Sequence, residues 1–142
     1  MKIKDKVIQP LFKQAKQAMN RAYSPYSHVK VGATVYMSNG KSYSGCNIEN
    51  SSYGGTICAE RVAIFKAISE NDTPLEIKKV VIVTDATPPW PPCGICRQVI
   101  AEFSSKNTEI HLVNLEGAHK KFSFEQLLPQ AFKPKNLLKK KK

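Results

Sequence analysis

Residues 79–84 read Lys-Val-Val-Ile-Val-Thr, and this stretch decides the fold. Its large aliphatic side chains follow one another without a polar interruption, which is typical of a strand buried on both faces. Such a strand needs helices above and below it and favours parallel pairing with a neighbour. The sequence therefore predicts an α/β fold, a single three-layer α/β/α domain around a mixed sheet of about five strands.

The first third of the chain predicts a helix followed by a β-hairpin. Apolar residues recur at helical spacing up to about Ala22. We expect the regular helix to begin near Pro10, because a proline in the first turn loses no hydrogen bond. Residues 31–37 and 41–46 are predicted strands, and Asn39-Gly40 between them is a strong hairpin signal.

The rest of the chain supplies the remaining predicted elements. Thr56 is the expected cap of a helix that runs to Glu70. The expected core face of this helix consists of Val62, Ala63, Phe65 and Ile68. The last expected elements are a helix at 93–103, a strand at 109–113 and a short helix at 124–128.

Two short motifs carry the chemistry, Cys58-Ala59-Glu60 and Pro92-Cys93-Gly94-Ile95-Cys96. Cys93 and Cys96 are three residues apart, so on a helix both sulfurs can reach one ion, and Cys58 can complete a set of three ligands. Three protein ligands leave the fourth tetrahedral position of zinc to water, as in catalytic sites. The sequence therefore predicts that Cys58, Cys93 and Cys96 bind Zn²⁺.

Glu60 stands two residues after a predicted ligand, where a carboxylate can accept a proton from water and deliver it to a substrate. It is the predicted catalytic residue. Three thiolates and Zn²⁺ sum to a charge of −1, which weakens the metal as a Lewis acid. Arg61 and Arg97 each follow directly after a motif residue, and we expect both to donate to ligand sulfurs and offset this charge.

Other interpretations of the cysteines are open. A closed structural zinc site needs a fourth ligand, for which the candidates are Cys46, His28, His111 and His119. None of these has ligand spacing to another ligand, and Cys46 is expected to be a small buried residue. A redox dithiol is the third interpretation, but the pair lacks the setting of a thioredoxin-like motif.

A Glu two residues after the first ligand, with P-C-x-x-C downstream, is also the signature of zinc deaminases. The chain resembles the cytidine deaminases of the small, homotetrameric, three-cysteine type over about residues 10 to 134. The matching stretches outside the zinc motifs are Ala22-Tyr23-Ser24-Pro25-Tyr26-Ser27, Val31-Gly32-Ala33, Asn47-Ile48-Glu49-Asn50, Ser52-Tyr53-Gly54 and Leu127-Leu128-Pro129-Gln130-Ala131-Phe132.

This resemblance implies hydrolytic deamination of cytidine and deoxycytidine to uridine and deoxyuridine plus ammonia, in pyrimidine salvage. It implies that Asn47 and Glu49 bind the sugar hydroxyls, and that Phe132 reaches the active site of a neighbouring subunit in a homotetramer. Two departures bear on specificity. Val29 stands where the family commonly has Phe, and Trp90 lies in the proline-rich stretch 86–92. Trp90 could replace the missing aromatic surface, cap the entrance of the pocket or meet another subunit.

The composition of the 142 residues, 42% of them hydrophobic, is that of one domain, predicted at 1–134 with a basic, flexible tail at 135–142. The net charge of +11 leaves open a noncatalytic, zinc-stabilised nucleic-acid-binding module, although the lysines are scattered and no nucleic-acid motif is present. A deaminase of a modified or bulky cytosine nucleoside such as blasticidin S is the other alternative. The N-terminal region shows no secretory signal or membrane span, and free thiolates suit a reducing compartment, so we expect a cytoplasmic protein.

Overall fold

The chain folds around one mixed sheet of five strands. In the computed structural model, which describes residues 5–73 and 75–138, the order across the sheet is β2-β1-β3-β4-β5. The strands are β1 (Val31–Met37), β2 (Ser42–Cys46), β3 (Ile77–Thr84), β4 (Ser104–Asn114) and β5 (His119–Ser123). β3 and β4 pair parallel, and all other neighbours pair antiparallel. The predicted mixed sheet is confirmed.

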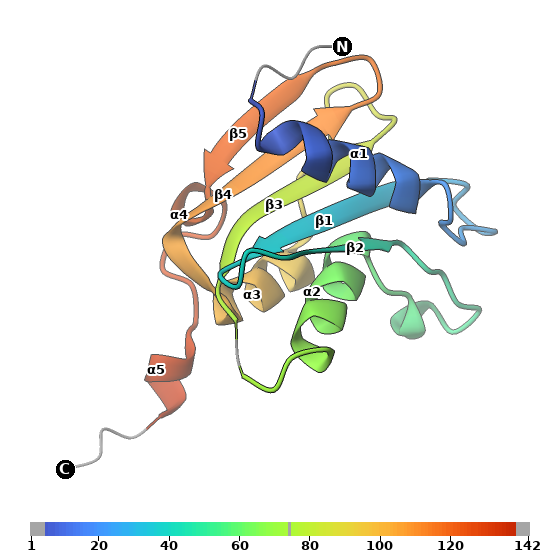
Figure 1. Cartoon of the computed structure of the whole chain (residues 1–142). Coiled ribbons are helices and arrows are strands. Elements are labelled where there is room, and N and C mark those ends of the chain that lie inside the picture. The colour runs from blue at the N-terminus through green and yellow to red at the C-terminus, as the bar shows by residue number, and fades with distance from the viewer. Residues whose placement is uncertain (1–4, 74, 139–142) are drawn as a thin grey trace.

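Helices cover both faces of this sheet (Figure 1). One face carries α1 (Ile8–Met19), and the other carries α2 (Ala59–Ser69) and α3 (Gly94–Glu102). Short helical turns complete the fold: η1 (Tyr53–Gly55), α4 (Phe124–Leu127) and α5 (Pro134–Leu137). The three-layer α/β/α arrangement predicted from residues 79–84 is therefore present.

The central strand β3 is buried on both faces, as its sequence predicts. Val80 and Ile82 pack into the core under α2 and α3, whereas Val81 and Val83 pack into the core under α1. Successive side chains of a strand point to opposite faces, so an unbroken aliphatic run serves two cores at once.

Two glycines let the helices approach the sheet closely. A Cβ on Gly32 of β1 would lie 1.9 Å from the backbone oxygen of Ala15 in α1. A Cβ on Gly45 of β2 would lie 2.6 Å from the backbone nitrogen of Ala63 in α2. Larger residues at these positions would push both helices outward, and with α2 they would displace the motif that begins at Cys58.

Some predicted details are wrong. Cys58, not Thr56, is the N-cap of α2, and the hydroxyl of Thr56 accepts a hydrogen bond from the backbone N–H of Asn50. The buried face of α2 consists of Ala59, Glu60, Ala63, Ile64 and Ala67. Phe65, by contrast, is 45% exposed and lies outside this buried face.

The ends of the chain agree in part with the sequence. Pro10 lies in the first turn of α1, as expected, because a proline there loses no hydrogen bond of the helix. The predicted tail begins within α5, and Lys139–Lys142 lie outside the described residues. No helix among residues 5–73 and 75–138 has the length and apolar character needed to cross a membrane.

Candidate zinc centre and active site

The three motif cysteines converge at the N-termini of two helices. Cys58 is the N-cap of α2, Cys93 is the N-cap of α3, and Cys96 lies in the first turn of α3. Their Sγ atoms all lie within 4.8 Å of one another. The positive end of each helix dipole favours anionic thiolates at these positions, so the fold prepares the cysteines to bind a cation.

The spacing of the sulfurs fits a zinc ion. Zinc–sulfur bonds of about 2.3 Å at a tetrahedral angle place two sulfurs about 3.8 Å apart. The Sγ atoms of Cys58 and Cys93 are 3.8 Å apart. This pair therefore has the separation of two zinc ligands, and the third sulfur, of Cys96, lies within 4.8 Å of both.

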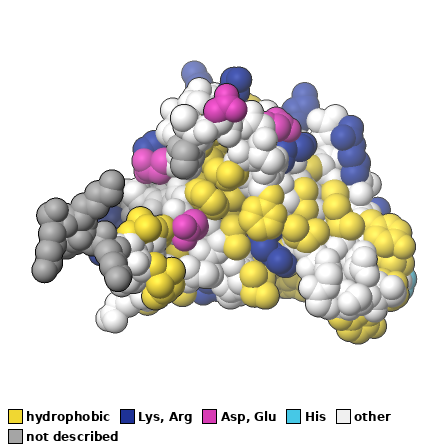
Figure 2. Space-filling model, turned by 90° about the horizontal axis from the view of Figure 1, so that it is seen from below, with side chains coloured by type: hydrophobic (Ala, Val, Ile, Leu, Met, Phe, Trp, Pro, Cys, Tyr) yellow, Lys and Arg dark blue, Asp and Glu magenta, His cyan; other side chains and the backbone are white. Residues whose placement is uncertain are grey.

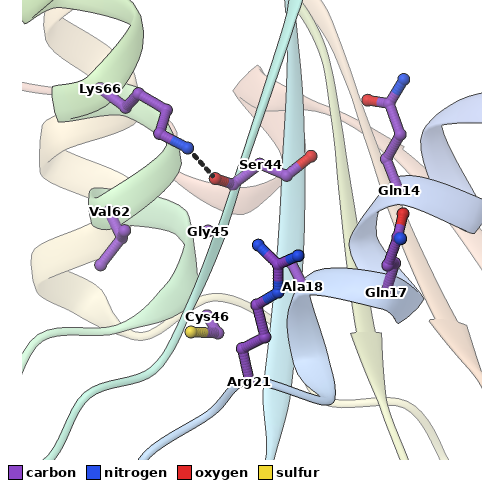
Figure 3. Close-up of a pocket in the computed structure, with 9 residues that line it drawn as sticks. All are labelled: Gln14, Gln17, Ala18, Arg21, Ser44, Gly45, Cys46, Val62 and Lys66. Carbon is purple, nitrogen blue, oxygen red and sulfur yellow. Dashed lines mark hydrogen bonds between the residues drawn. The ribbon is translucent and has the colours of Figure 1, made fainter.

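A fourth protein ligand is missing from this group within the described part of the chain. Nδ1 of His111 lies 3.0 Å from Nε2 of His119, and Nε2 of His111 lies 3.3 Å from Glu109, so both histidines belong to a polar cluster on β4 and β5. Cys46 lines a separate pocket of about 280 Å³ between α1 and α2, together with Arg21 and Lys66 (Figure 3). Three ligands favour a catalytic centre over a closed structural one.

Arg61 contacts the sulfur cluster. One of its terminal nitrogens lies 3.5 Å from Sγ of Cys58. A hydrogen bond with Cys96, supported by Arg61 and Cys93, lowers the pKa of Cys58 to about 5. The same bond, together with burial, raises the pKa of Cys96. Cys58 is thus a thiolate at neutral pH, and a bound zinc ion would favour the anionic form of its cysteine ligands.

Glu60 is buried next to these sulfurs. Its side chain is 4% exposed, on the face of α2 that packs against the sheet. Burial, with a smaller effect from the charge of Cys58, raises the pKa of this carboxyl to about 7. A carboxyl in this environment can both take up and release a proton near neutral pH, which is what a general acid and base must do.

Glu60 lines a cavity of about 360 Å³ that also contains two of the cysteines, Cys58 and Cys93. The predicted sugar-binding residues, Asn47 and Glu49, line the same cavity. Further lining residues are Ser27, Val29, Val31, Thr56, Ile57, Ala59, Ile82, Thr84, Trp90 and Pro91. The volume falls within the usual range for small-molecule sites, so one cavity brings together the metal ligands, the carboxylate and polar groups that could orient a substrate.

Hydrogen bonds to neighbouring loops hold Asn47 and Glu49 in place. The amide of Asn47 donates to the carbonyl of Val29 and accepts from the N–H of Val31, each over 2.8 Å. The carboxylate of Glu49 accepts from the N–H of Tyr26 over 2.9 Å and from the hydroxyl of Ser27. The N–H of Ser27 also donates to this carboxylate, over 3.2 Å, so part of its acceptor capacity remains for a ligand.

Arg97 is placed differently from the prediction. Its Nε donates to the carbonyl of Pro92 over 2.8 Å and Nη1 to the carbonyl of Leu127 over 2.7 Å, so these contacts go to backbone oxygens and not to a sulfur. The neighbouring Gln98 donates to the carbonyl of Phe132 over 2.8 Å. Both side chains of α3 therefore hold the end of α4 and the segment that follows it.

Phe132 is 55% exposed and is not among the residues that line the cavity of its own chain. Simple core packing is thus not its role. Its outward orientation is compatible with a contact to another copy of the chain.

Several residues that line the cavity were not predicted from the sequence. Thr84 and Ile82 reach the cavity because β3 ends beneath it, and Ile57 because a β-bridge joins it to Ile48. A strand end or an isolated bridge leaves no local sequence signal. The sequence left three roles for Trp90 open and could not choose among them, because its loop has no periodic pattern; the structure places Trp90 on the cavity wall.

This arrangement defines a class of protein, the zinc-dependent enzymes in which water is activated beside a carboxylate. The chain belongs to the family described as "Cytidine and deoxycytidylate deaminase zinc-binding region", whose model matches residues 5–112.

Known members of the family are similar to most of the chain. Cytidine deaminase of Halalkalibacterium halodurans is 47% identical over 124 residues, covering 87% of this chain and 92% of the relative. Cytidine deaminase of Sporosarcina psychrophila is 44% identical over 130 residues, covering 92% and 94%. The crystal structure of cytidine deaminase from Burkholderia pseudomallei superposes with a TM-score of 0.82 at 42% identity, covering 87% of this chain and 97% of that one.

The contact between Arg61 and Cys58 leads to a testable expectation. Because the guanidinium offsets one thiolate charge, Arg61→Gln should lower kcat by about 10- to 100-fold with zinc still bound. Lys66→Gln, which removes a positive charge from the exposed end of the same helix, is the control and should leave kcat unchanged. Equal turnover in both variants at full zinc occupancy would show that Arg61 has no influence on the centre.

Proposed function

We propose that the chain catalyses the zinc-dependent hydrolytic deamination of cytidine and deoxycytidine to uridine and deoxyuridine, with release of ammonia. One observation carries the proposal: the buried carboxyl of Glu60 shares a cavity with two cysteines of the cluster, Cys58 and Cys93, and with Asn47 and Glu49. The relatives that bear the name cytidine deaminase support it, since two of them are 44% and 47% identical over most of the chain.

The roles of the residues follow from their positions. A zinc ion on Cys58, Cys93 and Cys96 would supply Lewis acidity that makes water nucleophilic at neutral pH. Glu60 accepts a proton from the attacking water and passes it to the ring nitrogen next to the carbon that bears the amine. Glu60 then takes the second proton of the water from the new hydroxyl and transfers it to the amine. The carbon–nitrogen bond breaks, the carbonyl forms and the amine leaves as ammonia.

Asn47 and Glu49 are suited to hold the sugar. A carboxylate accepts hydrogen bonds from vicinal hydroxyls, and the bonds from Tyr26 and Ser27 fix its orientation before substrate arrives. Orientation that is fixed in advance lowers the entropy cost of binding. A nucleoside is therefore favoured over the free base.

The test is a panel of substrates given separately to the zinc-loaded protein: cytidine, deoxycytidine, cytosine and blasticidin S. We expect the absorbance change of deamination with the first two and little with cytosine. Turnover of blasticidin S alone would favour the alternative function, deamination of a modified or bulky cytosine nucleoside. The observation that supports this alternative is the small side chain of Val29 in the cavity wall. Inactivity on all four, with nucleic-acid binding that weakens steeply with salt, would favour the noncatalytic module.

We further infer that the chain forms a homotetramer whose neighbouring subunits complete each active site, and that it acts in the cytoplasm in pyrimidine salvage. Figure 2 shows hydrophobic side chains gathered on the face seen from below, the side of the sheet on which α2 and α3 lie. Phe65 of α2, Ile95 of α3 and Phe132 are exposed although they are large and apolar. Exposed apolar surface of this kind marks interaction sites. A light-scattering mass equal to one chain would contradict assembly.

A further inference from the structure

We propose that the indole of Trp90 is the aromatic surface against which the pyrimidine ring stacks, so that Trp90 determines which bases the cavity accepts. The inference rests on the proposed function, because it concerns the base of the same substrate. It assigns a role to a residue outside the zinc motifs.

The composition of the cavity wall is the first argument. Among the described residues that line the cavity, Trp90 is the one aromatic side chain. The other large apolar groups are aliphatic: Val29, Val31, Ile57 and Ile82. An aliphatic wall offers dispersion contacts but no π-face, so a planar base has one stacking partner within the chain.

The exposure of Trp90 is the second argument. Its side chain is 47% exposed, although tryptophan is highly buried on average in folded proteins. Because the residue lines the cavity, exposed indole surface is available to a molecule that enters it. An aromatic surface left open in a cavity beside a catalytic carboxyl is a binding surface.

The anchoring of the loop is the third argument. The backbone N–H of Trp90 lies 3.4 Å from the hydroxyl of Thr84, a buried residue at the end of β3. Asn114, buried at the end of β4, donates to the hydroxyl of Thr87 over 2.8 Å. Prolines on both sides of Trp90, at 89 and 91, restrict the backbone further. The indole is thus presented from a fixed loop, which reduces the entropy lost on binding.

The size and type of the effect follow from the physics of stacking. Removing an aromatic partner of a base weakens binding by about 10- to 100-fold. The ring keeps its place against the indole while one of its carbons is attacked, so stacking contributes about equally to the bound substrate and to the transition state. Loss of the indole should therefore act mainly on KM, and kcat should change by less than about threefold.

Intrinsic fluorescence gives a direct test, because Trp90 is the only tryptophan of the chain. We expect cytidine to change the emission of zinc-loaded Glu60→Gln protein in a saturable way, and ribose to leave it unchanged at equal concentration. Calorimetry on the same samples measures binding independently. Cytidine binding without a change in emission would overturn the role of Trp90 alone. No binding of cytidine by the zinc-loaded wild-type chain would overturn the proposed function as well.

Substitutions give the second test. Trp90→Leu should raise KM for cytidine by about 10- to 100-fold, and Trp90→Phe, which keeps an aromatic ring, should stay within about fivefold of wild type. Adding Val29→Phe to Trp90→Leu returns a ring to the same cavity and should recover part of the loss. Far-ultraviolet circular dichroism checks that the variants fold. Equal KM values for the Leu and Phe variants would refute stacking.

Discussion

Glu60→Gln is expected to lower kcat by about 10³- to 10⁴-fold while zinc content and fold stay intact. Glutamine matches the size of glutamate and can keep a hydrogen bond within the site, but it cannot take up a proton. In the proposed reaction the same carboxyl moves two protons, one to the ring nitrogen and one to the leaving amine. Both transfers fail together in the variant.

Steady-state kinetics with cytidine, alongside zinc analysis of the same samples, measures this effect. Glu70→Gln is a matched control, because Glu70 is the C-cap of the helix on which Glu60 lies in the first turn, and it is exposed. That variant should retain wild-type kcat. If Glu60→Gln kept more than about a tenth of wild-type kcat with zinc bound, another group would have to carry the proton.

Because Glu60 is buried, Glu60→Gln should abolish activity without lowering the stability of the fold. A buried carboxylate is costly unless it is compensated, and burial raises the pKa of Glu60 to about 7. A neutral amide in its place avoids that cost. We therefore expect the melting temperature of the Gln variant to equal or exceed that of wild type, with activity lost all the same.

Local sequence patterns explain why the zinc ligands could be predicted. Cys93 and Cys96 share a helix turn, so their spacing alone places both sulfurs on one side. Cys58 lies at the start of a different helix, so its place beside the other two could not be deduced from spacing. Its prediction as a ligand depended on the resemblance of the whole series of motifs. In the same way, the unbroken aliphatic run of β3 predicted helices on both faces, because such a run is typical of a strand covered on both sides.

The missed features depend on contacts between distant segments. Strand β5 reads His-Lys-Lys-Phe-Ser and lies at the edge of the sheet, so few of its side chains are buried and it has no apolar pattern. Arg97 follows a cysteine in the sequence, yet its guanidinium reaches the carbonyl of Leu127, thirty positions further along the chain. Phe65 is exposed, whereas the adjacent Ile64 is buried, because α2 packs closely against β2 at Gly45 on its other side. None of these contacts can be deduced from spacing within one element.

Cys96→Ala is expected to remove both zinc and activity. Cys96 is fully buried, and its sulfur is the third member of the ligand group. Two thiolates and an alanine cannot hold zinc at the affinity of a three-cysteine set, and any zinc that remained would lack its catalytic coordination. We expect less than about a tenth of wild-type zinc content after dialysis, and a loss of turnover at least as large.

The fourth cysteine makes this experiment specific. Cys46→Ala removes a thiol from the separate pocket between α1 and α2 and should leave zinc content and kcat unchanged. Counting reactive thiols in the native, zinc-loaded protein gives an independent measure, because metal-bound sulfurs are protected. Wild type should expose Cys46 alone, whereas Cys96→Ala should expose all three of its remaining thiols to the reagent. Full zinc content in Cys96→Ala, or zinc loss in Cys46→Ala, would mean that the ligand set has been assigned to the wrong cysteines.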